Sequence, residues 1–337
     1  MHSVSRVYAQ AIVQLAERCG LELPSALLAA VRGAPRVPLA TQDALWDAYC
    51  RAAADPLAGL RVGLALQAGH LDSAGLQLVT CETLGEALHD LVEVAPAIGE
   101  GGGFALVCDG AKVQLRYLPR LAVRQRERVE AVLAGALSLA RWATGGRFAA
   151  DGLWFAHDPP APQAAYAALL DVPLRFGAGH DALVCDASQL ALPLVQANAA
   201  LHEHLRTLTD RTLAALGQSS LAAAVQRLVH ANPAWGRERV AAALGISGRH
   251  LVRRLADDGV SFRALRDTVL HGIACRRLAG ARRVVDIAAE LGFSDERAFV
   301  RAFRRWGGTT PARFRGTAGA VSGEAGGITP PGPRAGA

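Results

Sequence analysis

The chain carries one helical pattern twice in its last hundred residues. Residues 239–259 read RVAAALGISGRHLVRRLADDG, and residues 286–315 read DIAAELGFSDERAFVRAFRRWGGTTPARFR. In both copies an apolar helical pattern runs into Leu-Gly, then a large apolar residue and serine, and then an arginine-rich helical pattern. A glycine can end a helix in the left-handed conformation, and a serine can cap the next helix. Each copy is therefore predicted to be a helix-turn-helix unit.

The two copies align closely enough to predict equivalent positions. Ser247 and Ser294 are the predicted caps of the two second helices. One residue is inserted after the second serine, and beyond it the match resumes. The matched pairs are Leu251 with Phe299, Val252 with Val300, Arg253 with Arg301, and Leu255 with Phe303.

A long helix is predicted between the copies. The segment 261–279, SFRALRDTVLHGIACRRLA, has helical periodicity and begins at Ser261, which can cap it. At about 1.5 Å per residue it would span roughly 28 Å. One turn of DNA is roughly 34 Å, so such a rod can hold two helices near successive major grooves of double-stranded DNA.

The outer faces of the two second helices are rich in groups that can bind bases. Arginine can bind guanine through two acceptors, glutamate can accept from cytosine, and valine can contact a thymine methyl. Four further arginines, at 304, 305, 313 and 315, are expected on phosphates, where they would position the protein. Helical geometry, together with the family resemblance given below, predicts these DNA-binding residues: Ser247, Arg249, Val252, Arg253, Ser294, Glu296, Arg297, Arg301 and Arg305.

The charge distribution supports an anionic partner for this region. Residues 219–316 contain 18 arginines against 8 acidic residues, a net charge of +10. The whole chain has a formal charge of +6, so the remainder carries −4. A basic surplus confined to one region is the electrostatic pattern expected for nucleic-acid binding.

Residues 219–315 resemble the DNA-binding domain of the AraC/XylS family of bacterial transcription regulators. The resemblance is carried by IAAELGF and by AFVRAFRRWGGTTPARFR in the second copy. It implies a sequence-specific regulator, with RNA polymerase as a further partner. Two departures bear on the second copy: Arg297 stands where relatives have a small serine, and Glu296 places an acid in a region facing phosphates.

The preceding part of the chain changes from helical to strand periodicity. Helical patterns cover residues 4–32, with a break at Pro24, and then 42–54 and 83–94. Two strand patterns flank an Asp-Gly pair at 109–110, which is a strong hairpin signal. Further patterns give the order ββαβαββ. The predicted fold class is an α+β N-terminal domain followed by an all-α DNA-binding domain with two helix-turn-helix units joined by a long helix.

Residues 1–195 resemble, more loosely, the "arabinose-binding-like" N-terminal domain found in one subgroup of that family. LGEALHDLV and residues 176–186, FGAGHDALVCD, carry this resemblance. It implies effector binding and a homodimer, and it leaves the effector and its binding residues unknown. Four aromatic residues could either line an apolar effector pocket or belong to the plain hydrophobic core. They are Trp154, Phe155, Tyr166 and Phe176.

No catalytic residue, cofactor site or metal site is predicted, and the chain is not expected to be an enzyme. The glycine-rich segment 99–103 precedes a strand and lacks a following Lys-Ser/Thr, so it reads as a turn. His202 and His204 are two residues apart, so they point to different faces of a helix and cannot bind one metal ion together. They are interpreted as part of a solvated helical linker. A fused methyl-acceptor enzyme would need a Pro-Cys-His setting, and none of the six cysteines has one.

The expected organisation is an effector-binding and dimerisation domain at 1–195, a helical linker at 196–218, the DNA-binding domain at 219–316, and a disordered tail at 317–337. The tail is too poor in apolar residues to fold. The absence of an apolar leader or span predicts a cytoplasmic protein with no membrane partner. The leading function is an effector-controlled transcription regulator. The alternative is a constitutive DNA-binding regulator whose N-terminal domain only dimerises.

Overall fold

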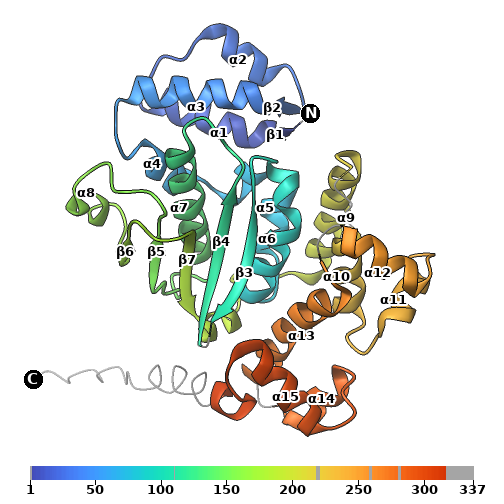
Figure 1. Ribbon diagram of the computed structural model, residues 1–337. Helices are drawn as coiled ribbons and strands as arrows, with labels where there is room; N and C mark the ends of the chain where they lie inside the picture. Colours follow the sequence, from blue (N-terminus) through green and yellow to red (C-terminus); the bar gives the residue numbers. More distant parts are fainter. Residues whose placement is uncertain (1, 110, 218–220, 258–259, 280–281, 316–337) are drawn as a thin grey trace, which may run out of the picture.

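The computed structural model describes residues 2–109, 111–217, 221–257, 260–279 and 282–315. An α+β part is followed by a separate group of helices, as the sequence predicted (Figure 1). The tail predicted to be disordered, residues 317–337, lies outside the described residues, and so does Gly110 of the predicted hairpin turn.

Residues 3–53 form a small helical layer closed by two short strands. Its elements are β1 (Ser3–Ser5), α1 (Arg6–Arg18), α2 (Ser25–Arg32), β2 (Arg36–Pro38) and α3 (Leu39–Ala53). The predicted break at Pro24 separates α1 from α2. The antiparallel β1–β2 pair was not predicted, because three residues are too few to set a period-2 pattern. The core of this layer includes Ile12 and Trp46, both fully buried.

Four short helical elements lead into the sheet. They are α4 (Ala58–Ala65), the 3-10 helix η1 (Ala68–Leu71), α5 (Asp72–Val79) and α6 (Leu84–Ile98). The predicted cap of α6 is confirmed, since Thr83 accepts a 3.3 Å hydrogen bond from the Glu86 amide. The sequence did not predict α4. It packs so closely on the long helix α7 (Gln125–Ala143) that a Cβ at Gly59 would lie 2.1 Å from the Glu127 carbonyl oxygen.

A five-stranded sheet of order β3-β4-β7-β5-β6 forms the centre of the α+β part. All its pairings are antiparallel except β5 with β6. Val113, Leu115 and Tyr117 alternate along β4 toward the core beneath α6 and α7. The predicted ββαβαββ order is confirmed. The elements are β3 (Gly102–Asp109), β4 (Lys112–Pro119), α7 (Gln125–Ala143), β5 (Gly152–Trp154), α8 (Gln163–Ala167), β6 (Leu174–Arg175), β7 (Asp181–Asp186) and the 3-10 helix η2 (Ala187–Ala191).

The next helix, α9 (Ala199–Ala215), lies along the α+β part. Asn198 caps it by accepting the Leu201 amide at 3.0 Å. Leu205, Thr209 and Leu213 are buried, and the helix packs on α5 and α6. The face of α9 that carries these residues is therefore covered, although the sequence pattern predicted a solvated helix.

The remaining helices form a second core of their own. They are α10 (Leu221–Ala231), α11 (Arg237–Ala243), α12 (Gly248–Asp257), α13 (Phe262–Ala279), α14 (Val284–Glu290) and α15 (Glu296–Gly307). The central helix α13 contributes Leu270, Ala274 and Leu278 to this core. Among the described residues, no helix has the length and apolarity that a bilayer crossing requires.

Candidate DNA interface and effector cavity

The first helix-turn-helix corner forms as its sequence predicts. Gly245 ends α11 with φ +70°, and nothing lies within 4 Å of where its Cβ would be. Ser247 then caps α12 by accepting a 3.2 Å hydrogen bond from the His250 amide. Glycine is therefore needed at position 245 for its positive φ and not for lack of space, because a residue without a Cβ adopts the left-handed conformation without strain.

The second corner differs at its cap. Gly292 again has a positive φ, +76°. The predicted cap, Ser294, is wrong: Asp295 caps α15 by accepting the Ala298 amide at 2.7 Å, and the Ser294 hydroxyl donates to the Asp295 carboxylate. The inserted residue explains this, because Asp295 precedes Phe299 by four residues, just as Ser247 precedes Leu251. The hydrogen bond from the Ala298 amide lowers the pKa of Asp295.

The exposed face of α12 carries the side chains predicted for the first copy. Arg249 and Arg253 are exposed, and Val252 retains 41% of its accessible surface although it is apolar. Leu251 and Leu255 on the opposite side are fully buried. A shallow surface depression is lined by Arg237, Glu238, Ser247, Gly248, Arg249 and Val252. Arg253 lies on the same helix but does not line the depression.

The exposed face of α15 repeats this arrangement. Glu296, Arg297 and Arg301 line one shallow depression together with Val300. Val300 is the partner of Val252 in the alignment of the two copies, yet it was not among the predicted site residues. The signal was present in the sequence: both copies share Arg-x-x-Val-Arg, at 249–253 and 297–301. Ser294, at the preceding corner, is also exposed.

The helix α13 and one arginine hold the two units together. Ser261 caps α13, as predicted, by accepting the Ala264 amide at 3.1 Å. Its 18 residues give a length of about 27 Å. From α13, Arg266 donates to the carbonyls of Trp235 and Pro233, before the first unit, and of Leu291 in the second. Burial lowers the pKa of Arg266.

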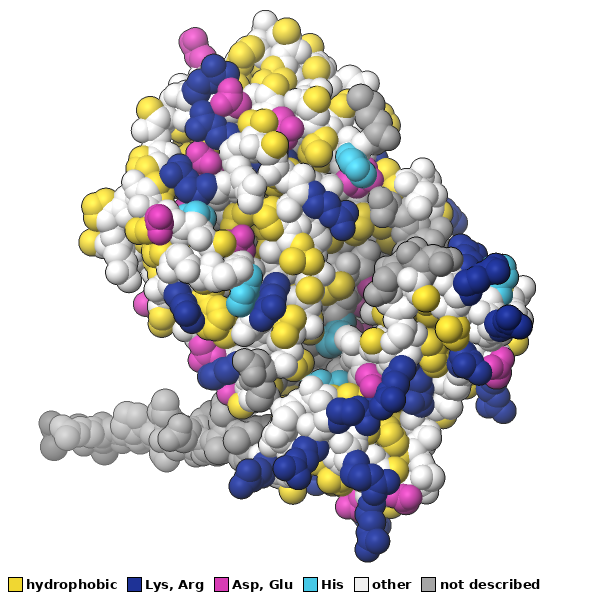
Figure 2. Space-filling view, in the orientation of Figure 1, with side chains coloured by type: hydrophobic (Ala, Val, Ile, Leu, Met, Phe, Trp, Pro, Cys, Tyr) yellow, Lys and Arg dark blue, Asp and Glu magenta, His cyan; other side chains and the backbone are white. Residues whose placement is uncertain are grey.

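Two of the arginines predicted to face phosphates make contacts within the protein. Arg305 pairs with Asp267 of α13 at 3.1 Å, with half of its side chain still exposed. Arg315 donates to the carbonyls of Leu278 and Arg282. Arg304 is exposed. Many basic side chains gather over the helical part, in the lower right of Figure 2.

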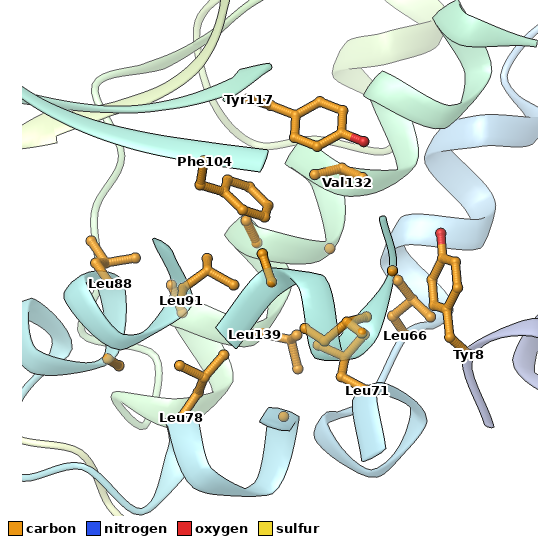
Figure 3. Close-up of a pocket in the computed structure, with 18 of the residues that line it drawn as sticks. Tyr8, Leu66, Leu71, Leu78, Leu88, Leu91, Phe104, Tyr117, Val132 and Leu139 are labelled. Carbon is orange, nitrogen blue, oxygen red and sulfur yellow. The ribbon is translucent and has the colours of Figure 1, made fainter. Parts of the chain in front are cut away.

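A second site lies inside the α+β part. An apolar cavity of about 170 Å³ opens between α5, α6, α7 and the β3–β4 hairpin. Figure 3 shows Leu78, Leu91 and Leu139 directed into it from three helices, with Phe104 and Tyr117 above them from the strands. Side chains of this kind bury apolar ligand surface.

Few polar groups line the cavity, and they lie toward one end. Tyr8 and Tyr117 contribute phenol groups to the cavity. Among the described residues that line it, Arg128 carries the charge. Arg128 is buried, ion-paired with Asp43, and lies 6.0 Å from the centre of the Trp46 ring. Burial raises the pKa of Tyr8 and Tyr117, so both phenols are neutral donors at pH 7.

The four aromatic residues considered for an effector pocket do not line this cavity. Phe176 instead stacks on Phe155 at 5.5 Å between ring centres and meets Tyr166 edge-on at 5.0 Å. The Tyr166 hydroxyl donates to Glu130 at 2.7 Å, and burial raises the pKa of Glu130 to about 7. Phe155 and Tyr166 are fully buried and belong to the hydrophobic core, which was the second of the two interpretations of these aromatic residues.

Two helix-turn-helix units beside an α+β domain define a DNA-binding transcription regulator. A family model described as "Arabinose-binding domain of AraC transcription regulator, N-term" matches residues 12–194, and a helix-turn-helix domain model matches residues 240–317. The chain belongs to the AraC family of transcription regulators, with an arabinose-binding-like N-terminal domain.

Curated relatives agree with this class. An ornithine utilization regulator of Pseudomonas aeruginosa is 28% identical over 267 residues, covering 77% of this chain and 79% of the relative. An uncharacterised helix-turn-helix regulator of Mycobacterium tuberculosis is 36% identical over 76 residues, 22% of each chain. The crystal structure of the regulator CdpR from P. aeruginosa aligns over 91% of this chain and 97% of its own, with 21% identity and a TM-score of 0.49. Such relatives are regulators, not enzymes.

Proposed function

We propose that the protein reads a specific operator by placing α12 and α15, its recognition helices, in two successive major grooves. Arg249, Val252 and Arg253 would contact bases in the first groove. Glu296, Arg297 and Arg301 would do so in the second, with Val300 as an added apolar contact. Ser247, Ser294 and Arg305 would contact the backbone beside these grooves.

The repeated Arg-x-x-Val-Arg face is the observation that supports this proposal most directly. Two chemically similar faces, on α12 and α15, occur in one domain, and α13, a helix of about 27 Å, lies between the two units in the chain and packs against both. An exposed valine among arginines is unfavourable in water but suits contact with thymine methyl groups.

Selection of binding sites from a random DNA library would test whether the protein contacts two successive major grooves. The expected consensus has two half-sites whose centres are about 10–10.5 base pairs apart. The Arg301→Ala variant should lose preference in only one half-site. A consensus confined to a single short element would overturn the two-groove reading.

We further propose that a small-molecule effector controls the regulator by binding the apolar cavity. The described lining has no carboxylate, and its polar groups are grouped at one end. A sugar would leave most of its hydroxyls without partners there, at a large desolvation cost, so the effector is not expected to be arabinose. The ornithine named for the relative, with two charged amines, is a poor match for the same reason. A mainly apolar molecule with one polar end fits the lining best.

Thermal-shift screening of the purified protein with apolar carboxylic acids and alcohols tests effector control. A ligand at 100 times its Kd should stabilise the protein by about 2.7 kcal/mol. Ala136→Phe, which fills the cavity from α7, should abolish that shift, and Ala149→Phe, at an exposed position outside the cavity, should retain it. Absence of any shift would favour the alternative, a constitutive regulator whose N-terminal domain only dimerises.

A homodimer and a contact with RNA polymerase complete the proposal, both by analogy with the family. Sedimentation of the full chain with and without operator DNA would measure the first. Transcription from a promoter carrying the selected operator would measure the second.

A further inference from the structure

A cysteine, an aspartate and a histidine meet where α9 crosses the α+β part. Cys81 follows α5, Asp90 belongs to α6 and His202 to α9, so three separate segments supply the groups (Figure 1 shows α5, α6 and α9 side by side). Cys81 is buried, and the side chains of His202 and Asp90 are 14% and 24% exposed. The sequence predicted a polar, solvated helical linker here, whereas His202 is largely buried.

The three side chains lie close enough to supply ligands to one ion, and because the two contacts of His202 involve different ring nitrogens, one ion would take only one of them. Cys81 Sγ lies 3.6 Å from His202 Nδ1 and 3.8 Å from Asp90 Oδ2, and His202 Nε2 lies 3.5 Å from Asp90 Oδ2. Ligand atoms about 2.0–2.3 Å from a tetrahedral zinc ion are separated by roughly 3.3–3.6 Å. Donor atoms of all three residues fall within 4.8 Å of one another.

Gln77 contacts both His202 and Asp90 and fixes the orientation of their side chains. The Gln77 backbone carbonyl lies 3.2 Å from His202 Nδ1 and can accept a hydrogen bond from an Nδ1–H group. In that tautomer Nε2 carries the lone pair, on the side of Asp90. The Gln77 side-chain amide donates to Asp90 Oδ2 at 3.0 Å. Metal-binding histidines and carboxylates are held in this way in proteins.

An unexplained polar atom and an entry route lie at the same place. Gln77 is 2% exposed, and its Oε1 has no hydrogen-bond partner within the described parts of the chain. Because the nitrogen of the same side-chain amide donates to Asp90, Gln77 Oε1 lies beside the cluster and is a further possible metal ligand. A cavity of about 60 Å³ reaches Gln77, Asp90 and His202 from the junction with the helical part. Glu86 and Glu93 line it as well, opposed by Arg206 and Arg227.

We propose that Cys81, Asp90 and His202 bind a divalent metal ion of the zinc class. Thiolate, imidazole and carboxylate together match the ligand preference of Zn²⁺, and three protein ligands leave a fourth position for Gln77 Oε1 or water. On binding, the Cys81 thiol releases its proton to solvent. The ion ties α9 to α5 and α6, and α9 directly precedes the DNA-binding helices.

Metal titration of the tag-free full chain tests the site. Zn²⁺ should bind one per chain in competition with a chromophoric chelator and raise the melting temperature. Co²⁺ should give a thiolate-to-cobalt charge-transfer band. Cys81→Ser and His202→Gln should weaken binding roughly 100-fold or more and remove the band or its ligand-field pattern.

Matched variants keep the test decisive. His204→Gln, two residues away on the exposed side of α9, and Cys19→Ser, an exposed thiol, should bind as the unchanged protein does. Circular dichroism before metal addition identifies any variant that fails to fold, and Asp90→Asn then serves in its place. No stoichiometric zinc in the unchanged protein, or equal affinity in His202→Gln, would overturn the proposal.

Discussion

Arg253 and Arg301 occupy the same position of the two recognition helices, one residue after an apolar valine and two before a buried core residue. An arginine paired with guanine fixes one base position, whereas an arginine on phosphate acts on every sequence alike. The distinction can be measured one residue at a time.

Arg253→Ala should weaken operator binding by about 1–3 kcal/mol and relax the preference at one base pair. Arg254→Ala is the matched control, because it removes the same charge from an exposed neighbour on α12. Binding titrations against single-base operator variants would measure both effects. An unchanged preference in Arg253→Ala would remove this arginine from the reading face.

The Asp295 cap should affect stability and its pH dependence. Asp295→Ala should lower the melting temperature at pH 7 more than Ser294→Ala does, because the aspartate accepts the Ala298 amide. Its folded-state pKa is lowered, so its contribution is present above the ordinary value of 3.8 and is lost as the pH falls through the folded value. Equal losses in the two variants would contradict the assignment of the cap.

At the scale of elements, the two turn glycines make an internal comparison. Both have a positive φ, but only Gly292 also meets a neighbour: a Cβ there would lie 2.7 Å from Ala234 Cα. Gly245→Ala should cost about 1–2 kcal/mol from backbone strain. Gly292→Ala should cost about 1–3 kcal/mol more because the corner at 232–236 must shift. Urea unfolding of the two variants would measure the difference, and equal losses would contradict the close approach.

His271 should make the packing of α13 against α15 sensitive to acid. It lies against Phe303, Trp306 and Gly307, with His89 of α6 nearby. Burial, and secondarily His89, lowers its pKa from 6.5 to about 4. Because its folded-state pKa is lowered, neutral His271 stabilises the folded protein above pH 6.5, and this stability is lost as the pH falls toward 4.

Melting temperatures between pH 7 and 4.5 would test this dependence. The unchanged protein should lose stability over that interval, and His271→Gln should lose less. His204→Gln, exposed on α9, should follow the unchanged protein. An identical acid profile in His271→Gln would show that other groups control it.

The sequence predicted elements best where it repeats or alternates. The two helix-turn-helix units, the rod at 261–279 and the β3–β4 hairpin were visible because glycine, serine and period-2 patterns act locally. The helices α4 and α5 were missed because small residues such as Gly59 serve close packing there and give a weak helical pattern. The cavity and the meeting of Cys81, Asp90 and His202 depend on contacts across more than a hundred residues, which no local pattern encodes.

At the scale of the whole molecule, α13 makes the main contact between the two parts, and α15 on β3 adds a further one. The helix α13 packs on α6 and on η2, and Gly272 approaches the His89 ring so closely that a Cβ would meet it at 2.8 Å. The helix between the two helix-turn-helix units thus touches α6, one of the helices that line the apolar cavity. A ligand that moves α6 could change the placement of the recognition helices only if it favours one arrangement over another.

The central claim is that one chain enters two successive major grooves on one side of the duplex. Hydroxyl-radical footprinting on a selected operator, with methylation interference at guanines, measures this most directly. We predict two protected patches on one face, about one helical turn apart, with interference near one patch lost in Arg253→Ala and near the other in Arg301→Ala. A single protected groove, or both variants acting on the same patch, would contradict the account.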